Sequence, residues 1–156
     1  MNTCQTLELA IRESLAQYAG EAIPVSWLHC AFTPTDEDNG TGRVAYPQLL
    51  ITVGGKAQDE SGTQWDSVVT LTCATLSEQD CDGHNLAAMY EAAEEFFEHL
   101  LHGDELDERV AHFQGVVRRT IPTFCLGGFT PEATDGATVQ EGLRIAQFAG
   151  VLHYGY

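Results

Sequence analysis

Hydrophobic residues near the N-terminus recur at the spacing of a helix. The pattern predicts a helix over residues 3–18. Asn2 and Gln5 stand three residues apart at its start, where a capping box would satisfy backbone N–H groups that lack helical partners. The apolar stripe of this helix consists of Leu7, Ile11, Leu15 and Tyr18.

A second apolar stripe predicts a helix over about residues 85–102, begun by Asp82. At 100° per residue its apolar side chains cover an arc of about 140°, which is the width of an ordinary core-facing stripe. The stripe consists of Leu86, Met89, Tyr90, Ala93, Phe96, Phe97, Leu100 and Leu101. The opposite side carries Glu91, Glu94, Glu95, Glu98 and His102, with His99 at its margin.

Alternation of apolar and polar residues predicts two strands in the middle of the chain, over residues 46–53 and 65–75. The stretch "GGKAQDESGTQ" between them contains Gly and Asp and predicts a hairpin connection. A third strand, "VSWLHCAF", follows Pro24 and is rich in aromatic and branched residues. We expect it to extend the two-stranded antiparallel ribbon. The polar stretch "TPTDEDNGTGR" is expected to be a long loop.

The last third of the chain contains shorter and less regular patterns. Asp104 is a candidate cap for the short piece "ELDERVAHF", and "GVVRRTIPTF" has the composition of a strand that Pro122 weakens. The stretch "LGGFTPEATDG" contains two glycine turns and is expected to be a loop. A final long strand is predicted within "GLRIAQFAGVLHY".

The predicted order is therefore α-β-β-β-α-β-β. Strands that follow one another without intervening helices are typical of α+β proteins. We expect an antiparallel or mixed sheet of about five strands, with two main helices packed on one face. A length of 156 residues favours a single domain over 1–156.

Charge narrows the classes of partner. Twenty-three acidic residues face seven basic ones, which gives a formal net charge of −16. Proteins that grip nucleic acid or an anionic membrane need clustered Lys and Arg, and the nearest such feature is the pair Arg118 and Arg119. We therefore expect no sequence-specific nucleic-acid binding and no membrane binding.

The apolar runs, the N-terminal stretch and the cysteines predict the cellular compartment of the protein. No apolar run reaches the length of a membrane span, and "MNTCQTLELA" lacks the basic start and apolar core of a signal peptide. The five cysteines are odd in number and form no CxxC motif, which favours reduced thiols in a cytoplasm.

The helix over 85–102 raises the question of a metal site, because Glu95 and His99, and likewise Glu98 and His102, are four residues apart. Such pairs can share a metal ion on one helix face. However, these side chains point away from the predicted core, whereas metal ligands are usually held by buried hydrogen-bonding partners. No HExxH motif is present. We interpret the face as a solvated one.

Other candidate sites are weaker. Cys81 and His84 form half of a zinc site, and the other half would have to come from Cys73, Cys30 or His29 at no recognised spacing. The acidic pairs Asp36 with Asp38 and Asp80 with Asp82 lack the glycine and distal glutamate of a calcium loop. No nucleophile elbow, P-loop or dinucleotide fingerprint occurs. The sequence thus predicts no catalytic, cofactor-binding or metal-binding residue, and favours a structural or interaction protein over an enzyme.

The order of elements carries a resemblance. A short N-terminal helix is followed by "YPQLLIT" entering a strand, by the strand "WDSVVTLT" and by the long helix "LAAMYEAAEEFFEHLL", and strands close the chain. This arrangement resembles the tail terminator, or tail-completion, proteins of long-tailed bacteriophages, and the resemblance covers essentially the whole chain.

The resemblance implies a structural role. Such proteins form a hexameric ring that caps the tail tube, stops its polymerisation and joins it to the head, and sheets of neighbouring subunits line the ring. The implied partners are copies of this chain, the tail tube protein and the neck or head-completion proteins. The implied location is the tail or neck of the virion, after assembly in the host cytoplasm. A ring traversed by DNA should not hold phosphates, which suits an acidic subunit, and a closing interface suits a sheet with open edges.

Three alternatives remain at this point. One is another neck or tail-tube component. A second is a small metal-dependent enzyme that uses Cys81, His84, Glu95 and His99. The third is a monomeric module that binds a basic partner.

Overall fold

The structure is a computed structural model that describes residues 1–32 and 45–156, with the backbone alone for Lys56. The polar loop predicted over 33–43, with Asp36 and Asp38, lies outside the described residues. The described chain folds as α+β with a mixed sheet, which confirms the predicted class. It contains three α-helices: α1 (Thr3–Tyr18), α2 (His84–His99) and α3 (Glu108–Arg118).

Six described strands form one sheet in the order β1-β2-β3-β6-β4, and β5 also pairs with β6. They are β1 (Leu28–Cys30), β2 (Gln48–Gln58), β3 (Trp65–Leu76), β4 (Cys125–Glu132), β5 (Thr138–Gln140) and β6 (Leu143–Gly155). All pairs are antiparallel except β1 with β2. The predicted β2–β3 hairpin and the long final strand are therefore confirmed, whereas β4 and β5 were not expected and the strand predicted over 115–124 is absent.

The N-terminal helix forms as its sequence predicts. Asn2 Oδ1 accepts from the backbone N–H of Gln5 at 2.8 Å, and the Gln5 side chain accepts from the backbone N–H of Asn2 at 3.0 Å. Leu7, Ile11 and Leu15 on its stripe are fully buried. Two short 3₁₀ turns, Gly20–Ala22 and Val25–Trp27, then lead into β1.

The first strand is shorter than predicted. Of the stretch 25–32, only Leu28–Cys30 is a strand, and it pairs with β2 in parallel. The expected extension of the ribbon by this strand is confirmed, and its parallel direction makes the sheet a mixed one. The chain between Tyr18 and Leu28 turns twice in 3₁₀ conformation, so β1 runs alongside β2 in the same direction.

Helix α2 has the predicted orientation, but a different residue secures its start. Its predicted apolar residues are buried, with Tyr90 and Leu101 partly so. Asp80 Oδ1 and Oδ2 accept from the backbone N–H groups of Asn85 and Leu86, at 3.0 and 3.1 Å. Asp82, the predicted cap, accepts only from His84 N. The Asp80 carboxylate is nearly inaccessible and therefore supports the first turn from inside the fold.

A third helix replaces a predicted strand. The stretch 115–124 was expected to be a strand because of its branched residues, but α3 includes its first part and a turn the remainder. Asp107, rather than the predicted Asp104, caps this helix by accepting from Arg109 N at 2.9 Å. The buried side of α3 consists of Val110, Phe113, Gln114, Val116 and Val117. This stripe at helical spacing outweighs the strand preference of two valines.

The predicted glycine loop after α3 is largely β4. Residues Cys125–Glu132 pair with β6, with an irregularity between Leu126 and Gly128. A Cβ at Gly128 would lie 2.7 Å from Leu101 O, so glycine is required where the chain after α2 passes close to the strand. The glycines therefore serve close packing and a bulge, and not a turn.

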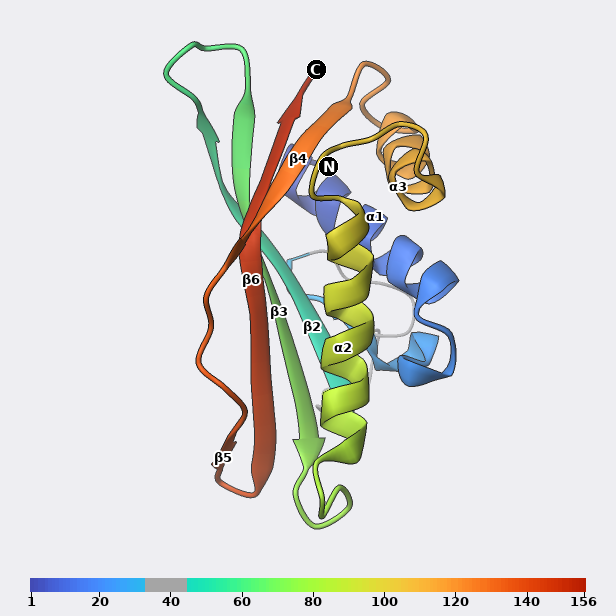
Figure 1. The fold of residues 1–156 in the computed structure, drawn as a ribbon, viewed down its shortest axis with the longest axis vertical. Helices are drawn as coiled ribbons and strands as arrows, with labels where there is room; N and C mark the ends of the chain where they lie inside the picture. Colours follow the sequence, from blue (N-terminus) through green and yellow to red (C-terminus); the bar gives the residue numbers. More distant parts are fainter. Residues whose placement is uncertain (33–44) are drawn as a thin grey trace.

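The helices all cover one face of the sheet (Figure 1). Helix α1 packs on β1 and β2, α2 packs on β3 and β6, and α3 packs against α1 and β4. The buried apolar side chains form one cluster between the helices and this face. Its aromatic centre is Phe97, whose ring lies 4.7 Å from that of Phe129 and 5.3 Å from that of Phe148.

Candidate functional site

The other face of the sheet is not covered by any described helix (Figure 1). Because side chains alternate along strands, the residues opposite the core can be assigned from the register. We call them the open face: Leu50 and Thr52 from β2, Val68, Thr70 and Thr72 from β3, and Ile145, Gln147, Ala149 and Val151 from β6. They form cross-strand rows, such as Leu50 with Thr72 and Gln147.

The open face carries no charge, although the chain has a formal net charge of −16. Three carboxylates lie at its borders: Asp66 beyond Val68 on β3, Glu132 paired with Ala149, and Asp135, which lines the hollow beside Ile145 and Ala149. Asp66 is engaged there, because His153 Nδ1 lies 2.7 Å from its Oδ1, and His153 Nε2 lies 2.7 Å from the Thr130 hydroxyl. A sheet face that only meets water usually carries charged residues in alternation with the core. Threonine, valine and alanine here make a neutral surface, and removing it from water costs less free energy than removing a charged surface would.

A hollow of about 610 Å³ lies at one side of the open face. Its floor includes Thr72, Ile145 and Ala149, and its wall is the segment 133–138 that leads into β5. The face is therefore not flat, and a protein surface docked on it would have a raised rim to fit.

Some outward-facing backbone groups of the two outer strands, β1 and β4, already form hydrogen bonds within the subunit. On β4, Leu126 N donates to Gln114 Oε1 at 2.8 Å, Phe129 N donates to Leu101 O at 3.2 Å, and Pro131 has no N–H. On β1, Leu28 O accepts from Arg12 Nε at 3.1 Å. Edges occupied in this way resist the addition of another strand. These bonds leave fewer free backbone groups on β1 and β4 for pairing with another strand, and we therefore take the open face as the better candidate contact.

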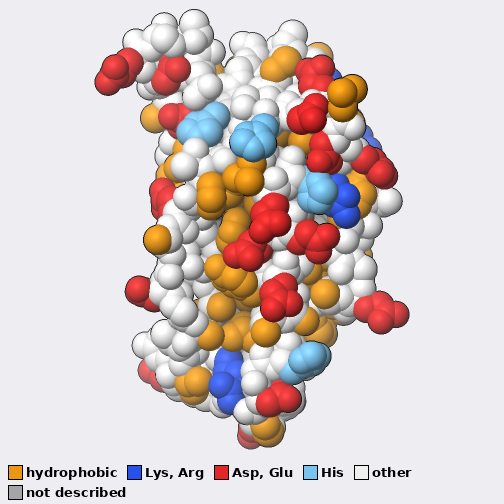
Figure 2. All heavy atoms as spheres, viewed as in Figure 1, with side chains coloured by type: hydrophobic (Ala, Val, Ile, Leu, Met, Phe, Trp, Pro, Cys, Tyr) orange, Lys and Arg blue, Asp and Glu red, His pale blue; other side chains and the backbone are white. Residues whose placement is uncertain are grey.

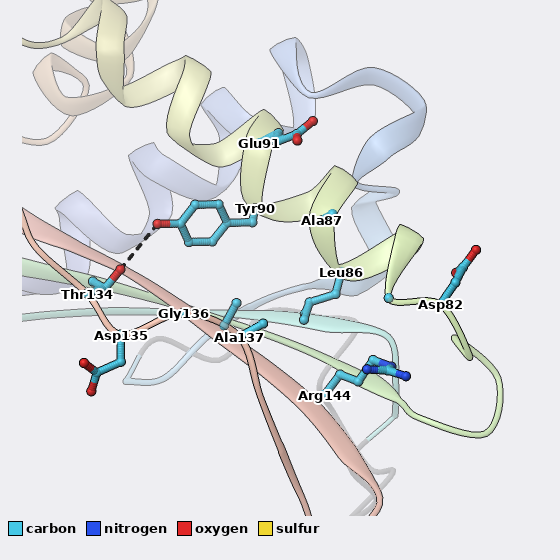
Figure 3. A pocket seen from close by; sticks show the side chains of 12 residues that line it. Asp82, Leu86, Ala87, Tyr90, Glu91, Thr134, Asp135, Gly136, Ala137 and Arg144 are labelled. Carbon is cyan, nitrogen blue, oxygen red and sulfur yellow. Dashed lines mark hydrogen bonds between the residues drawn. The ribbon is translucent and has the colours of Figure 1, made fainter.

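A second surface lies on the helix side, between α2 and the chain of residues 131–137. It contains two hollows, of about 450 Å³ and about 200 Å³. We call them together the α2 groove. Leu86, Ala87 and Tyr90 line the larger hollow, and Phe97 and Leu101 line the smaller one. Figure 3 shows Leu86 and Tyr90 pointing from α2 toward the facing segment, where the Tyr90 hydroxyl lies 3.4 Å from that of Thr134.

The rim of the α2 groove is acidic. In Figure 2, hydrophobic side chains run down the middle of the molecule with acidic ones beside them. The carboxylates that line the two hollows belong to Asp82, Glu91, Glu94, Glu98 and Asp135. The one basic residue there, Arg144, donates from Nε to Asp80 O at 2.7 Å, so its charge is directed toward the α2 entry turn.

The Glu and His side chains that were considered as metal ligands do not come together in the structure. Glu95, Glu98 and His102 are exposed, while His99 leaves them and binds Asp107 across the turn, with 2.7 Å between Nδ1 and Oδ2. Within residues 1–32 and 45–156, no three His, Cys, Asp or Glu side chains converge as metal ligands would.

The cysteines are also scattered. Cys81 and His84 are exposed, whereas Cys30 and Cys73 are buried in the core. Burial raises the pKa of the Cys73 thiol to about 12, so this group stays protonated and inert. His29 is half-buried on β1.

No protein-family model matches the chain, and no curated protein matches it. Among the described residues, no helix is both long enough and apolar enough to cross a bilayer.

The open face and the α2 groove were not predicted as sites from the sequence. A signal for the first was present, since residues 67–76 and 145–152 contain no charged side chain at either alternation. The groove could not be inferred, because the segment that forms its second wall was expected to be a loop of unknown position.

Proposed function

We propose that the protein is a structural subunit that assembles into a ring, and that the open face supplies a contact between neighbours. The observation that carries this proposal is the absence of charge from the open face of a strongly acidic chain. Contact between such subunits is opposed by charge repulsion wherever carboxylates meet. A neutral face is the part of the surface where close contact avoids this repulsion.

The ring we propose is of the tail terminator type. Its role would be to cap the tail tube of a long-tailed bacteriophage and to join it to the head, with the tail tube protein and neck proteins as partners. The family resemblance supports this, and so does the sequence of α1, the β2–β3 hairpin, α2 and the terminal strand. An acidic subunit also suits a lumen through which DNA passes without being held.

The contact we propose differs from simple edge pairing. Since Leu28 O on β1 and Leu126 N and Phe129 N on β4 are already used, we propose that a neighbour packs on the open face and against the raised segment 133–138. Such a contact is heterologous, because the face of one subunit meets a different surface of the next, and heterologous contacts can close into rings.

The test is the oligomeric state of the purified chain, by native mass spectrometry and negative-stain imaging. We expect closed rings for the wild type and smaller species for Val68→Lys, which places a charge on the open face where β3 pairs with β6. Val25→Lys is the matched control, because Val25 and Val68 are both 43% exposed and Val25 lies on a 3₁₀ turn away from that face. A wild-type monomer, or equal loss of rings in both variants, would contradict the proposal.

A further inference from the structure

We propose that the α2 groove binds a basic amphipathic helix of a different protein. The inference rests on different observations from the ring, because the groove lies on the helix side of the sheet and none of the nine open-face residues lines it. The two surfaces meet only at the segment that contains Thr134 and Asp135, which borders both.

The floor of the groove can hold two apolar anchors. Leu86 lines the larger hollow and Phe97 the smaller one, and they stand eleven residues apart on the same helix. At 1.5 Å per residue this separation is about 16 Å. A docked helix whose apolar side chains recur every three or four residues can place one in each hollow and pass over the contact between Tyr90 and Thr134.

The acidic rim of the groove favours a partner with basic side chains. Within the described residues, none of the five carboxylates along the two hollows forms an ion pair. Glu91, Glu94 and Glu98 are spaced by three and four residues, so they lie on one side of α2 and their charges follow the axis of the groove. A partner helix with Lys or Arg flanking its apolar stripe would meet this line of charge along its length.

The partner is not another copy of this chain. With seven basic residues in total, the only adjacent pair is Arg118 and Arg119. Arg118 Nε donates to Phe124 O at 2.8 Å, and Arg119 lies 3.1 Å from a carboxylate oxygen of Glu13. A second copy therefore presents no free basic amphipathic segment among its described residues.

The occupant is a helix rather than an added strand. Strand addition needs free backbone donors along β4, the strand that borders the groove. Leu126 N and Phe129 N already donate to other groups, and Pro131 has no N–H. Recognition must therefore come from side chains, which is the way that a helix docks in a groove.

The probe is a fluorescent synthetic peptide of about 16 residues, long enough for a helix of about 24 Å, with leucines at i, i+4, i+7 and i+11 and lysines between them. We expect it to bind the full chain in a fluorescence anisotropy titration. The same peptide with glutamates in place of the lysines should not bind. A version with a central proline, which cannot form a continuous helix, should bind at least about tenfold more weakly.

Variants of the protein locate the site. The double variant Glu94→Lys/Glu98→Lys should weaken binding by about tenfold or more. Glu95→Lys is the matched control, because Glu95 neighbours Glu94 on α2 but lines a different hollow beside α1, and it should change affinity by less than about twofold. Ala87→Trp, at an exposed position in the larger hollow, should fill the groove and also weaken binding.

Each result decides the proposal once thermal melts show that the variants remain folded. Absence of binding, or equal weakening by Glu95→Lys and the double variant, would mean that no groove-specific contact exists. Unchanged affinity in Ala87→Trp would place the peptide elsewhere. Equal binding of the proline peptide would overturn the helical form of the occupant.

Discussion

His99 and Asp107 join the end of α2 to the start of α3 through a hydrogen bond of 2.7 Å between Nδ1 and Oδ2. The second oxygen of Asp107 accepts from Arg109 N and caps α3. Burial alone would raise the pKa of Asp107, but these hydrogen bonds outweigh it and hold the pKa below the ordinary value of a carboxyl. A single carboxylate thus fixes the angle between two helices, in its ionised form.

We expect Asp107→Ala to lower the free energy of unfolding by about 1–2 kcal/mol, because the cap and the link to His99 are both lost. Asp107→Asn keeps a capping oxygen and should cost less. Since the folded pKa of Asp107 is lowered, its charge stabilises the fold above the unfolded pKa of about 3.9, and this contribution is lost as the pH falls through the folded value. Urea melts of wild type and Asp107→Asn between about pH 5 and pH 2 should therefore converge at the acid end. A constant difference would mean that the charge has no role.

Two aspartates at the entry to α2 should differ sharply. Asp80 accepts from Thr75 Oγ1 at 2.8 Å and from two backbone N–H groups, in a buried position, while Asp82 is exposed and accepts from one. We expect Asp80→Ala to cost on the order of 2–4 kcal/mol, because buried donors are left without acceptors. Asp82→Ala should cost about 0.5 kcal/mol. Denaturant melts of the two variants measure this, and equal effects would restore Asp82 as the cap.

Substitution by alanine should change stability in opposite directions at Gly150 and Gly115. A Cβ at Gly150 on β6 would lie 2.1 Å from a ring atom of Phe129 and 2.7 Å from Thr130 O, so Gly150→Ala must displace β4. We expect a loss of about 1–3 kcal/mol. Gly115 lies within α3 with nothing near its Cβ position, so Gly115→Ala should stabilise by about 0.5–1 kcal/mol. Thermal melts should move in opposite directions, and a stabilising Gly150→Ala would show that the aromatic cluster is loosely packed.

The proposed ring should respond to salt in a defined direction. Each subunit carries a formal charge of −16, and repulsion between exposed charges weakens as the Debye length falls from about 30 Å at 0.01 M to about 10 Å at 0.1 M. Contacts made by a neutral face contain no ion pairs, so added salt weakens them little. We expect light scattering to show more rings as salt rises over this range, and a gel shift to show no retained DNA. Rings that dissociate with added salt would mean that ion pairs hold the contact.

Local patterns were sufficient where one face of an element is apolar. The stripes of α1 and α2, and the alternation of β2 and β3, each predicted the element and its buried side, and the apolar run near the end of the chain predicted β6 as a strand. These elements bury long, regular arrays, so their periodicity is carried by many residues.

Local patterns failed where distant contacts decide the structure. Val116 and Val117 favour a strand by propensity, but their burial against the rest of the core makes them helical. Gly127 and Gly128 suggest a turn by composition, yet both lie in β4, where Gly128 allows the strand to pass beside the chain that follows α2 and Gly127 faces His153 on β6. The α2 groove depends on the second of these corrections, since its second wall continues from β4.

The pairing of β6 has a consequence for how the chain is made. This strand lies between β3 and β4 and also pairs with β5, so half of the sheet depends on it. Yet Trp65 on β3 meets Tyr154 on β6, and a ribosome adds everything between them before that contact can form. Until then, β3 presents an unpaired edge with the uncharged run 67–76, and β4 has no strand to join. We therefore expect newly synthesised subunits to expose this edge until β6 is added, a stage at which chaperone binding and premature association would compete with folding.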